Sequence, residues 1–407
     1  MAFSEVARKA AWTDRIEAPK LMSKVAVVNA DFRVQVVSSE NGDCRTFNGY
    51  GNMHMWPVWS PNGQQVLFSG YSTIMNGHGR QRLLLHDLGN GDAQIIYDSE
   101  PGADAIAPRT PHYSAWSPDG RRVAMLARNM LRKGLSLYLL DPSRGDAPEK
   151  FIDGAPLFFS WSPNSRFLLV HSRFDHYIVD FRDDSYVTRL NYKSGLYSAP
   201  SWSPRGGKFA LMHEVPGGRQ TLQLVNPKGD CVQEIAEVDG AGAFSLWPKG
   251  DRIGLLRGQI GQSRYFKELW LAPLFGGDEQ QLIGEPVFAF YWSPSGAHIA
   301  YVTPAPNMEG VMRLGIVNTE NGYTRYMVDF KPTEEQLTQL MFFDQYSQTH
   351  NPWSPDGTKL VFTGTLTDEY QQDHKRTQGP SVFLVDVFGE RPVRPLAAGV
   401  MGSWQRC

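Results

Sequence analysis

The sequence predicts an all-β protein, an eight-bladed β-propeller. Three observations support this: a repeated motif, its spacing, and the β-forming segments that follow each copy. A degenerate copy with Leu246 in the tryptophan position fills the widest gap, and a unit of about 40–50 residues with β character is typical of propeller blades. The complete motif, Trp-Ser-Pro, begins at Trp59, Trp116, Trp161, Trp202, Trp292 and Trp353.

Each motif continues into a predicted tight turn. In the Ser-Pro-Asp-Gly stretch at 117–120, the residue types suit the four positions of a type I turn, because proline presets φ and glycine admits a positive φ. Alternating or continuous β-formers follow, as in "QQVLFSG" at 64–70. Further strands are predicted at 82–88 and 93–99, so that each repeat supplies a four-stranded blade.

The two ends of the chain complement each other. Residues 24–30, 32–39 and 44–48 predict the second, third and fourth strands of a blade that lacks its first strand. Residues 398–404 predict a first strand with nothing after it. We therefore expect the ends to pair in one composite blade that closes the ring and leaves no exposed sheet edge. Seven blades are the alternative, if the ends do not pair or the degenerate copy forms no blade.

Two segments have a different character from the repeats. Residues 1–22 form an N-terminal extension that could include a short helix, and residues 23–407 are expected to form a single propeller domain. Within 332–346, proline and threonine precede Glu334 and Glu335, a pattern that favours the start of a helix. Neither segment is expected to form a domain of its own.

Composition excludes several classes of protein. A net charge of −2 and a pI near 6.6 give no support to nucleic-acid binding. Three cysteines without a CxxC motif indicate neither a disulfide framework nor a cysteine metal site. The N-terminus lacks the order of a signal peptide and no apolar run is long enough to cross a membrane. We expect a cytoplasmic protein, or a periplasmic one if a leader precedes this sequence.

The Trp-Ser-Pro-Asp-Gly repeats resemble those of the WD40-like, TolB-type β-propeller family, also called PD40 repeats. The likeness covers roughly residues 24–407 and is strongest at 57–68, 114–125 and 351–362. It implies a scaffold or interaction platform, although function inferred from a fold is analogy. Peptidase relatives carry an α/β-hydrolase domain, but this sequence has no GxSxG nucleophile motif. TolB-type proteins carry an extra N-terminal domain, whereas only about 20 residues precede the first predicted strand here.

The candidate site follows from propeller geometry. The residues just before each motif tryptophan and the loops between second and third strands lie on one face. The longest such loops are predicted at 70–81 and 364–380, and long loops on a rigid scaffold are frequent binding sites. We expect the site over blades eight, one and two. Its candidate ligand- or partner-binding residues are His54, Trp56, Arg109, His112, Tyr113, Asp344, Gln348 and His350.

The motif tryptophans and the mouth aromatics each allow two interpretations. The motif tryptophans could form a repeated ligand site, but packing beside a tight turn explains every residue of the motif, so a structural role is favoured for all of them, Trp404 included. Aromatic residues at the channel mouth could stack on a ligand or plug the channel, and plugging is favoured. These aromatic residues are Trp56, Tyr113, Phe158, Tyr197 and Phe288.

Two function classes stay open. The favoured one is a non-catalytic scaffold that binds a protein, peptide or small ligand at the channel mouth, with no catalytic residue and no cofactor. The alternative is a metal-dependent enzyme. Oligogalacturonate lyases are related propellers with a metal held by histidine and glutamine, which the pairs Gln348–His350 and His213–Glu214 loosely match. The candidate metal ligands are His54, His112 and His350, through imidazole nitrogens.

Overall fold

The structure is a computed structural model that describes residues 23–47, 51, 53–73, 79–89, 93–98, 113–129, 134–145, 147–182, 186–194, 198–261, 265–367, 379–389 and 393–406. Within these ranges the chain is built of antiparallel strands and two short helices, α2 (Glu334–Met341) and α3 (Phe343–Tyr346), which confirms the predicted all-β class. Neither helix has the length and apolar composition that crossing a membrane requires. The extension at 1–22, with its possible helix, lies outside the described residues.

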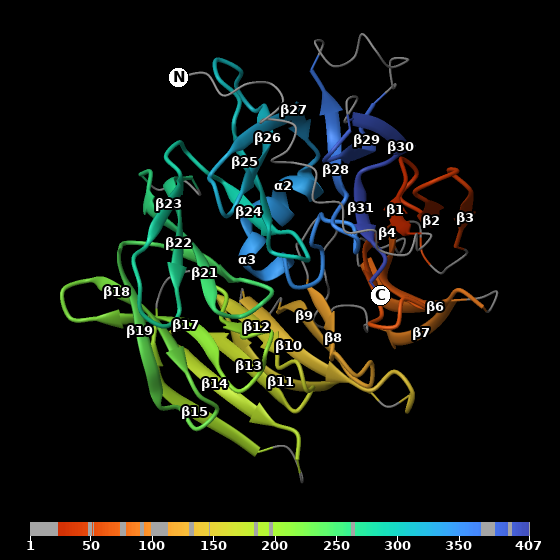
Figure 1. The fold of residues 1–407 in the computed structure, drawn as a ribbon. Helices are drawn as coiled ribbons and strands as arrows, with labels where there is room; N and C mark the ends of the chain where they lie inside the picture. The colour runs from red at the N-terminus through yellow and green to blue at the C-terminus, as the bar shows by residue number, and fades with distance from the viewer. Residues whose placement is uncertain are drawn as a thin grey trace.

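The described strands form six four-stranded sheets and one seven-stranded sheet. Figure 1 shows them following one another around α2 and α3. The first two sheets along the chain are β3 (Cys44–Thr46), β2 (Val34–Ser38), β1 (Lys24–Val28) and β31 (Met401–Trp404); then β4 (Met53–Trp59), β5 (Gln65–Thr73), β6 (Gly79–Asp87) and β7 (Ala93–Asp98).

The next four sheets each contain four consecutive strands. They are β8 (Ser114–Trp116), β9 (Val123–Asn129), β10 (Gly134–Leu140) and β11 (Glu149–Gly154); β12 (Leu157–Trp161), β13 (Phe167–Ser172), β14 (Asp175–Asp180) and β15 (Tyr186–Lys193); β16 (Ser201–Trp202), β17 (Phe209–Val215), β18 (Arg219–Val225) and β19 (Cys231–Asp239); and β20 (Ala243–Leu246), β21 (Arg252–Gln259), β22 (Phe266–Pro273) and β23 (Gln280–Ile283). The degenerate repeat therefore supplies an ordinary sheet, with Leu246 at the end of its innermost strand.

The seven-stranded sheet joins two repeats. Its strands are β24 (Ala289–Trp292), β25 (His298–Pro304), β26 (Met312–Asn318), β27 (Thr324–Pro332), β28 (Lys359–Leu366), β29 (Ser381–Asp386) and β30 (Val393–Ala398). The junction is the pairing of the end of β27 with the end of β28, where Lys331 lies opposite Thr365. Gly364 permits this approach, because a Cβ there would collide with the Lys331 carbonyl.

The predicted pairing of the chain ends is confirmed. Strand β31 is antiparallel to β1, with Trp404 opposite Val25 and Met401 opposite Val28. Both strands are buried, so the contact belongs to the core and not to a surface edge.

The motif tryptophans link neighbouring sheets. In five motifs the indole Nε1–H donates to the carbonyl of the residue just before the motif position in the preceding sheet. The bonds are Trp59 to Ser403 (3.0 Å), Trp161 to Ala115 (3.3 Å), Trp292 to Ser245 (3.1 Å), Trp353 to Tyr291 (2.9 Å) and Trp404 to Pro352 (2.7 Å). All these indoles are buried, as their packing role requires.

The predicted turns follow each tryptophan. At 117–120, the Gly120 N–H donates to the Ser117 carbonyl at 2.8 Å, and Gly120 has φ +72°. The Ser117 hydroxyl donates to the Asp119 carboxylate at 2.6 Å and accepts from the Arg122 N–H at 2.9 Å. These bonds close the turn, so the motif sequence accounts for its own local structure.

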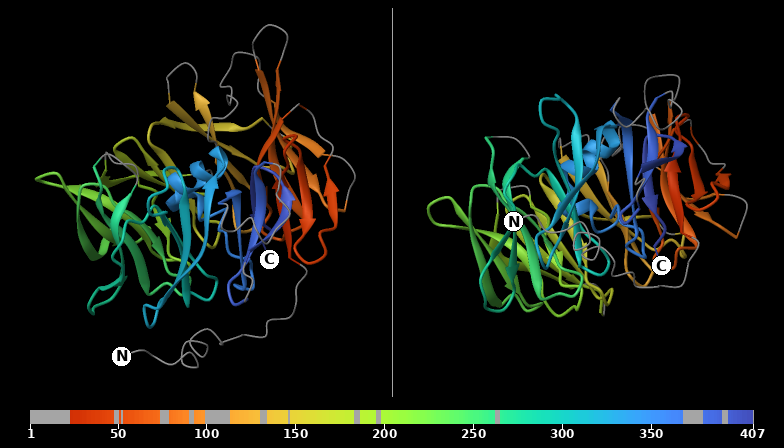
Figure 2. Two further views of the ribbon diagram at one scale, coloured as in Figure 1. Left: turned by 90° about the horizontal axis from the view of Figure 1, so that it is seen from above. Right: turned by 45° about the horizontal axis from the view of Figure 1, so that its top comes forward.

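Helices α2 and α3 lie between β27 and β28. The predicted helix start is confirmed, because Thr333 caps α2 by accepting from the Gln336 N–H at 3.1 Å. Every residue of α3 is buried. Figure 2 shows from two further sides that both helices lie among the sheets, and α2 is only partly buried, with Glu334 exposed.

Candidate functional site

The two ends of the central channel differ. We call the end where the innermost strands begin the entry end, and the end where they run into the Trp-Ser-Pro turns the turn end. The sequence places the candidate residues at the entry end. The structure puts α2, α3 and the turn after them inside the channel, so each candidate is best described by its relation to this insertion.

Side chains of the insertion bond to the backbone of two sheets and of the segment that leads into β16. The Gln345 amide pairs with Phe159 of β12, accepting from its N–H at 3.0 Å and donating to its carbonyl at 2.8 Å. The Asp344 carboxylate accepts from the Ala199 N–H at 2.9 Å, and the Gln336 side chain accepts from the Thr363 N–H at 2.9 Å. The insertion is therefore fixed to the surrounding backbone by hydrogen bonds from its own side chains.

Three candidate residues meet around Tyr346 of α3. Its ring centroid lies 5.5 Å from Trp56, 5.3 Å from Tyr113 and 5.5 Å from His350. Trp56 reaches this position at a bulge in β4, where it has φ +57°. Burial raises the pKa of Tyr113 to about 12 and also raises the pKa of Tyr346, so both hydroxyls are neutral at ordinary pH. This cluster fills the channel as a packed interior.

The candidate histidines lie in different surroundings. His54 is fully buried beside the Phe68 ring, with its Nε2 3.4 Å from an Arg33 nitrogen. His350 is also buried, and its Nδ1 lies 2.8 Å from the Thr349 hydroxyl. Burial lowers the pKa of His350 to about 3, and the positive charge of Arg406 acts in the same direction.

The remaining candidates are placed as follows. Arg109, His112 and Tyr197 lie outside the described residues, Asp344 is in α3, and Phe158 and Phe288 are buried. His213 contacts the backbone of Lys193. Across the ranges that the structure describes, no group of three or more His, Cys, Asp or Glu side chains is arranged to hold a metal.

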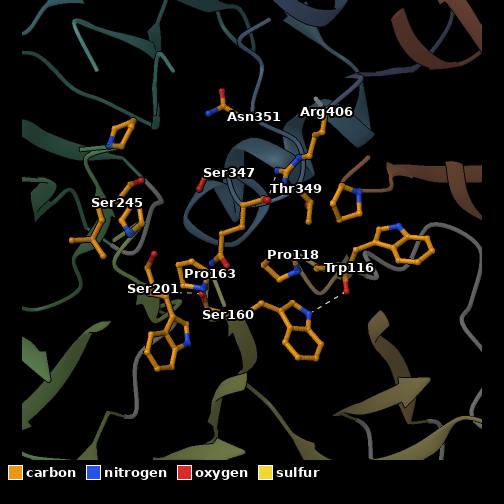
Figure 3. A pocket seen from close by; sticks show the side chains of 18 of the residues that line it. Trp116, Pro118, Ser160, Pro163, Ser201, Ser245, Ser347, Thr349, Asn351 and Arg406 are labelled. Carbon is orange, nitrogen blue, oxygen red and sulfur yellow. Dashed lines mark hydrogen bonds between the residues drawn. The ribbon is translucent and has the colours of Figure 1, made fainter. Parts of the chain in front are cut away.

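A cavity of about 560 Å³ occupies the turn end. Tyr113 and Gln348 are the two candidate residues that line it. Figure 3 shows Arg406 beside Thr349, across the cavity from Ser201. The walls are largely motif residues: Trp59, Trp116, Trp161, Trp202 and Trp292, with Pro61, Pro118, Pro163, Pro204 and Pro248. We call this space the turn cavity.

Sequence reasoning identified Gln348 but missed the rest of the polar side of the turn cavity. It is formed by the turn after α3 and by the residue that follows the last motif strand by two positions: Ser347, Gln348, Thr349, Asn351 and Arg406. The motif tryptophans both pack and line this space. One signal was available, since Arg406 follows Trp404 where the other motifs have the turn proline.

A second hollow, of about 540 Å³, lies at the entry end. Phe32, Met53, Met55 and Val400 give it an apolar floor, and Lys331, Glu334 and Glu335 contribute charge. It lies between the composite sheet, β4 and the β27–β28 junction, the sector that the loop lengths predict. The remaining lining residues are Pro332, Thr333, Thr365 and Pro380. We call it the entry groove. The central parts of the two predicted loops, 74–78 and 368–378, lie outside the described residues.

Comparisons with known proteins place the fold. No family model and no curated protein matches the chain. Among solved structures, a eukaryotic initiation factor is similar over 94% of this chain and 98% of its own, at 11% identity and a TM-score of 0.56. A prolyl endopeptidase is similar over 86% of this chain and 50% of its own, at 11% identity and a TM-score of 0.53. The chain has the β-propeller fold of these two structures, which confirms the predicted propeller at the level of fold.

Two further similar structures are a TolB and an oligogalacturonate lyase, the two kinds of propeller protein considered from the sequence. A TolB from Acinetobacter baumannii matches 74% of this chain at 16% identity, with a TM-score of 0.39. An oligogalacturonate lyase from Vibrio parahaemolyticus matches 82% of this chain and 85% of its own at 11% identity, with a TM-score of 0.48. Such low scores carry no argument about activity. The chain spans 62% of the length of that TolB and half that of the prolyl endopeptidase.

Proposed function

We propose that the chain is an eight-bladed propeller whose ring is closed by β31 and β1. Six four-stranded sheets supply six blades, and the seven-stranded sheet supplies two that are joined through β27 and β28. The isolated bridge between Trp353 and Leu360 marks the short first strand of the last blade. The tryptophan bonds support the closure, because Trp404 and Trp59 link the composite sheet to the sheets on both sides of it.

In this proposal the propeller is a non-catalytic scaffold that binds a protein or peptide segment in the entry groove. The observation that carries it is the groove itself, found in the sector that blade geometry and loop length predict. Its floor residues come from β4, from the turn between β1 and β2, and from the turn before β31, and its side is the capped start of α2. Such walls keep their shape before binding, which lowers the entropy cost of recognition.

The chemistry of the entry groove favours an apolar peptide segment. Met53 and Met55 are flexible and polarisable, so they adapt to different side chains. His54, between them in β4, is fully buried and supports the strand from inside. The charged groups Lys331 and Glu334 are exposed at the side and suit the polar margin of a binding site. The lyase alternative draws no support from the described residues, in which no three His, Cys, Asp or Glu side chains are arranged to hold a metal.

Peptide selection tests this function. Peptides selected from a random displayed library against the wild-type protein should bind it reversibly. Met53→Glu, which places a charge in the apolar floor, should weaken them about tenfold or more. Phe275→Glu is the matched control, because Phe275 is 55% exposed and does not line the groove. Fluorescence polarisation measures each affinity. Failure to select any peptide, or equal affinity for wild type and Met53→Glu, would sink the proposal.

A further inference from the structure

A groove of about 510 Å³ opens between two neighbouring sheets, where β13 begins and β14 ends. Figure 1 shows these sheets, β12–β15 and β16–β19, next to each other. The Tyr192 hydroxyl of β15 links them by donating to the Gly229 carbonyl, in the turn after β18, at 3.1 Å. The side chains that matter for recognition are Arg166, Phe167, Asp180, Arg182, Trp202 and Lys228, all of which line the groove. We call it the rim groove.

The rim groove carries more positive than negative charge. Three basic side chains line it, those of Arg166, Arg182 and Lys228, together with one carboxylate, that of Asp180. Both arginines pair with Asp180. Lys228 is exposed, and it forms no ion pair with any carboxylate in the described part of the chain. The charge of these lining residues therefore favours an anionic occupant.

The two arginines are adjacent because they share one carboxylate oxygen. Oδ2 of Asp180 accepts from Nη2 of Arg166 at 2.8 Å and from Nη2 of Arg182 at 3.0 Å. A guanidinium has five N–H groups, and in both arginines those of Nη1 have no acceptor among the described residues. The two side chains are 31% and 63% exposed, so a second carboxylate can approach them from solvent.

Arg166 is held in position before any ligand binds. Its Cζ lies 4.3 Å from the centre of the Phe167 ring, and that ring stacks on Trp202 with centroids 5.6 Å apart and an angle of 13° between the planes. Phe167 and Trp202 are both buried. A guanidinium that is already fixed loses little conformational entropy when it binds an anion.

Exposed apolar side chains lie beside the rim groove. Tyr186 is opposite Asp180 in the pairing of β14 with β15, and it is 71% exposed. Val187, the next residue of β15, is 43% exposed. Apolar surface next to a charged groove suits a protein partner that offers both kinds of side chain, because a simple ion would leave the apolar surface in water.

We propose that the rim groove binds an acidic peptide segment of a protein partner. Carboxylates of the segment bond to Arg166 and Arg182, beside the charge of Lys228. An apolar side chain of the segment packs on Tyr186. The existing bonds to Asp180 show that both guanidinium groups suit carboxylate oxygens. The rim groove shares no lining residue with the entry groove, so the two proposals are independent.

Selection from a displayed library tests this inference. The library holds dodecapeptides restricted to Asp, Glu, Phe, Leu and Gly, and it is selected on the full chain at low salt. Selected peptides should bind reversibly by fluorescence polarisation, and their affinity should fall as salt is added. Replacing their Asp and Glu by Asn and Gln should abolish binding. Arg182→Gln combined with Lys228→Gln should weaken the peptides about tenfold or more, because charged contacts are lost. Tyr186→Ser should weaken them several-fold.

Two controls complete the test. Arg144→Gln is the matched one, because Arg144 is also an exposed, ion-paired arginine in a turn, but it does not line the rim groove. Met53→Glu, which alters only the entry groove, separates this test from that of the proposed function. Both should bind the peptides as the wild type does, and thermal unfolding checks that every variant is folded. The inference is overturned if no peptide is selected, if the Arg182 and Lys228 double variant binds as well as wild type, if Met53→Glu abolishes binding, or if inorganic phosphate binds more tightly than every peptide.

Discussion

The entry end and the turn end of the channel are built from the same repeats, yet one is filled by an insertion and the other contains a cavity. At the entry end, α2 and α3 fill the channel, and Gln345, Asp344 and Gln336 satisfy backbone groups of two sheets and of the segment before β16. At the turn end, the same repeats leave a cavity of about 560 Å³. The difference shows that a single insertion decides where the channel of a repetitive fold is packed and where it stays open.

Acid should produce the largest effect, through buried histidines. Burial lowers the pKa of His350 and of His176 to about 3, with the charges of Arg406 and His171 respectively as further causes. The folded state therefore favours the neutral rings. Their contribution to stability is complete above the unfolded pKa near 6.5 and is lost as the pH falls toward 3, by up to about 1.4 kcal/mol per pH unit for each ring. Urea unfolding between pH 7 and pH 4 measures the slope.

In the same measurement, the variant His350→Asn isolates the contribution of the packed entry end to the pH dependence of stability. The variant should lose one histidine's share of the pH dependence, while His176 keeps its own. Its stability at pH 7 will be lower, so the informative quantity is the slope. An unchanged slope would mean that His350 does not stay neutral inside the folded channel.

Truncating the centre of the insertion should have the next largest effect. Tyr346→Ala removes the ring that contacts Trp56, Tyr113 and His350, and should lower the free energy of unfolding by about 3–5 kcal/mol, as for other buried aromatics. Tyr186→Ala is the control, because Tyr186 is 71% exposed in β15. Its effect should stay within about 0.5 kcal/mol. Similar losses in the two variants would contradict the packed-channel description.

The smallest effect concerns the indole N–H groups. Trp404→Phe removes a bond to the Pro352 carbonyl and should cost about 1 kcal/mol. Trp116→Phe removes an N–H that has no partner, so it should be close to neutral or slightly stabilising. Both variants keep most of the aromatic packing. Urea denaturation compares them directly, and an equal cost would show that the Trp116 N–H has an acceptor.

Much of the fold could be predicted because its signals are local. The type I turn at 117–120 needs only the residues that form it, and the strand pattern before and after each tryptophan is visible within a dozen residues. The pairing of β1 with β31 was also predictable, because two incomplete sets of strands at the ends complement each other. The junction of β27 and β28 could not be predicted, since it depends on the close approach of Gly364 to the backbone of Lys331, which is distant in the sequence.

The candidate site was predictable only in part. The sector in which the entry groove lies could be predicted, because loop length and strand direction define it. The residues that line the groove could not be predicted. In β4, Met53 turns toward the groove while His54 points inward, and Trp56 lies at a bulge that a strand pattern does not reveal. The helix at 334–341 was recognised from its start, but nothing in its own residues says that it enters the channel.

The sequence by itself determined the repeat, its turns and the β character of the chain, because these follow from backbone preferences and from packing between near neighbours. Only the tertiary structure decided which end of the channel is filled and which N–H groups of the motif tryptophans are left without acceptors. Those outcomes depend on distances between residues in different repeats, such as Trp404 and Pro352 or Arg406 and Gln348, which no local pattern encodes.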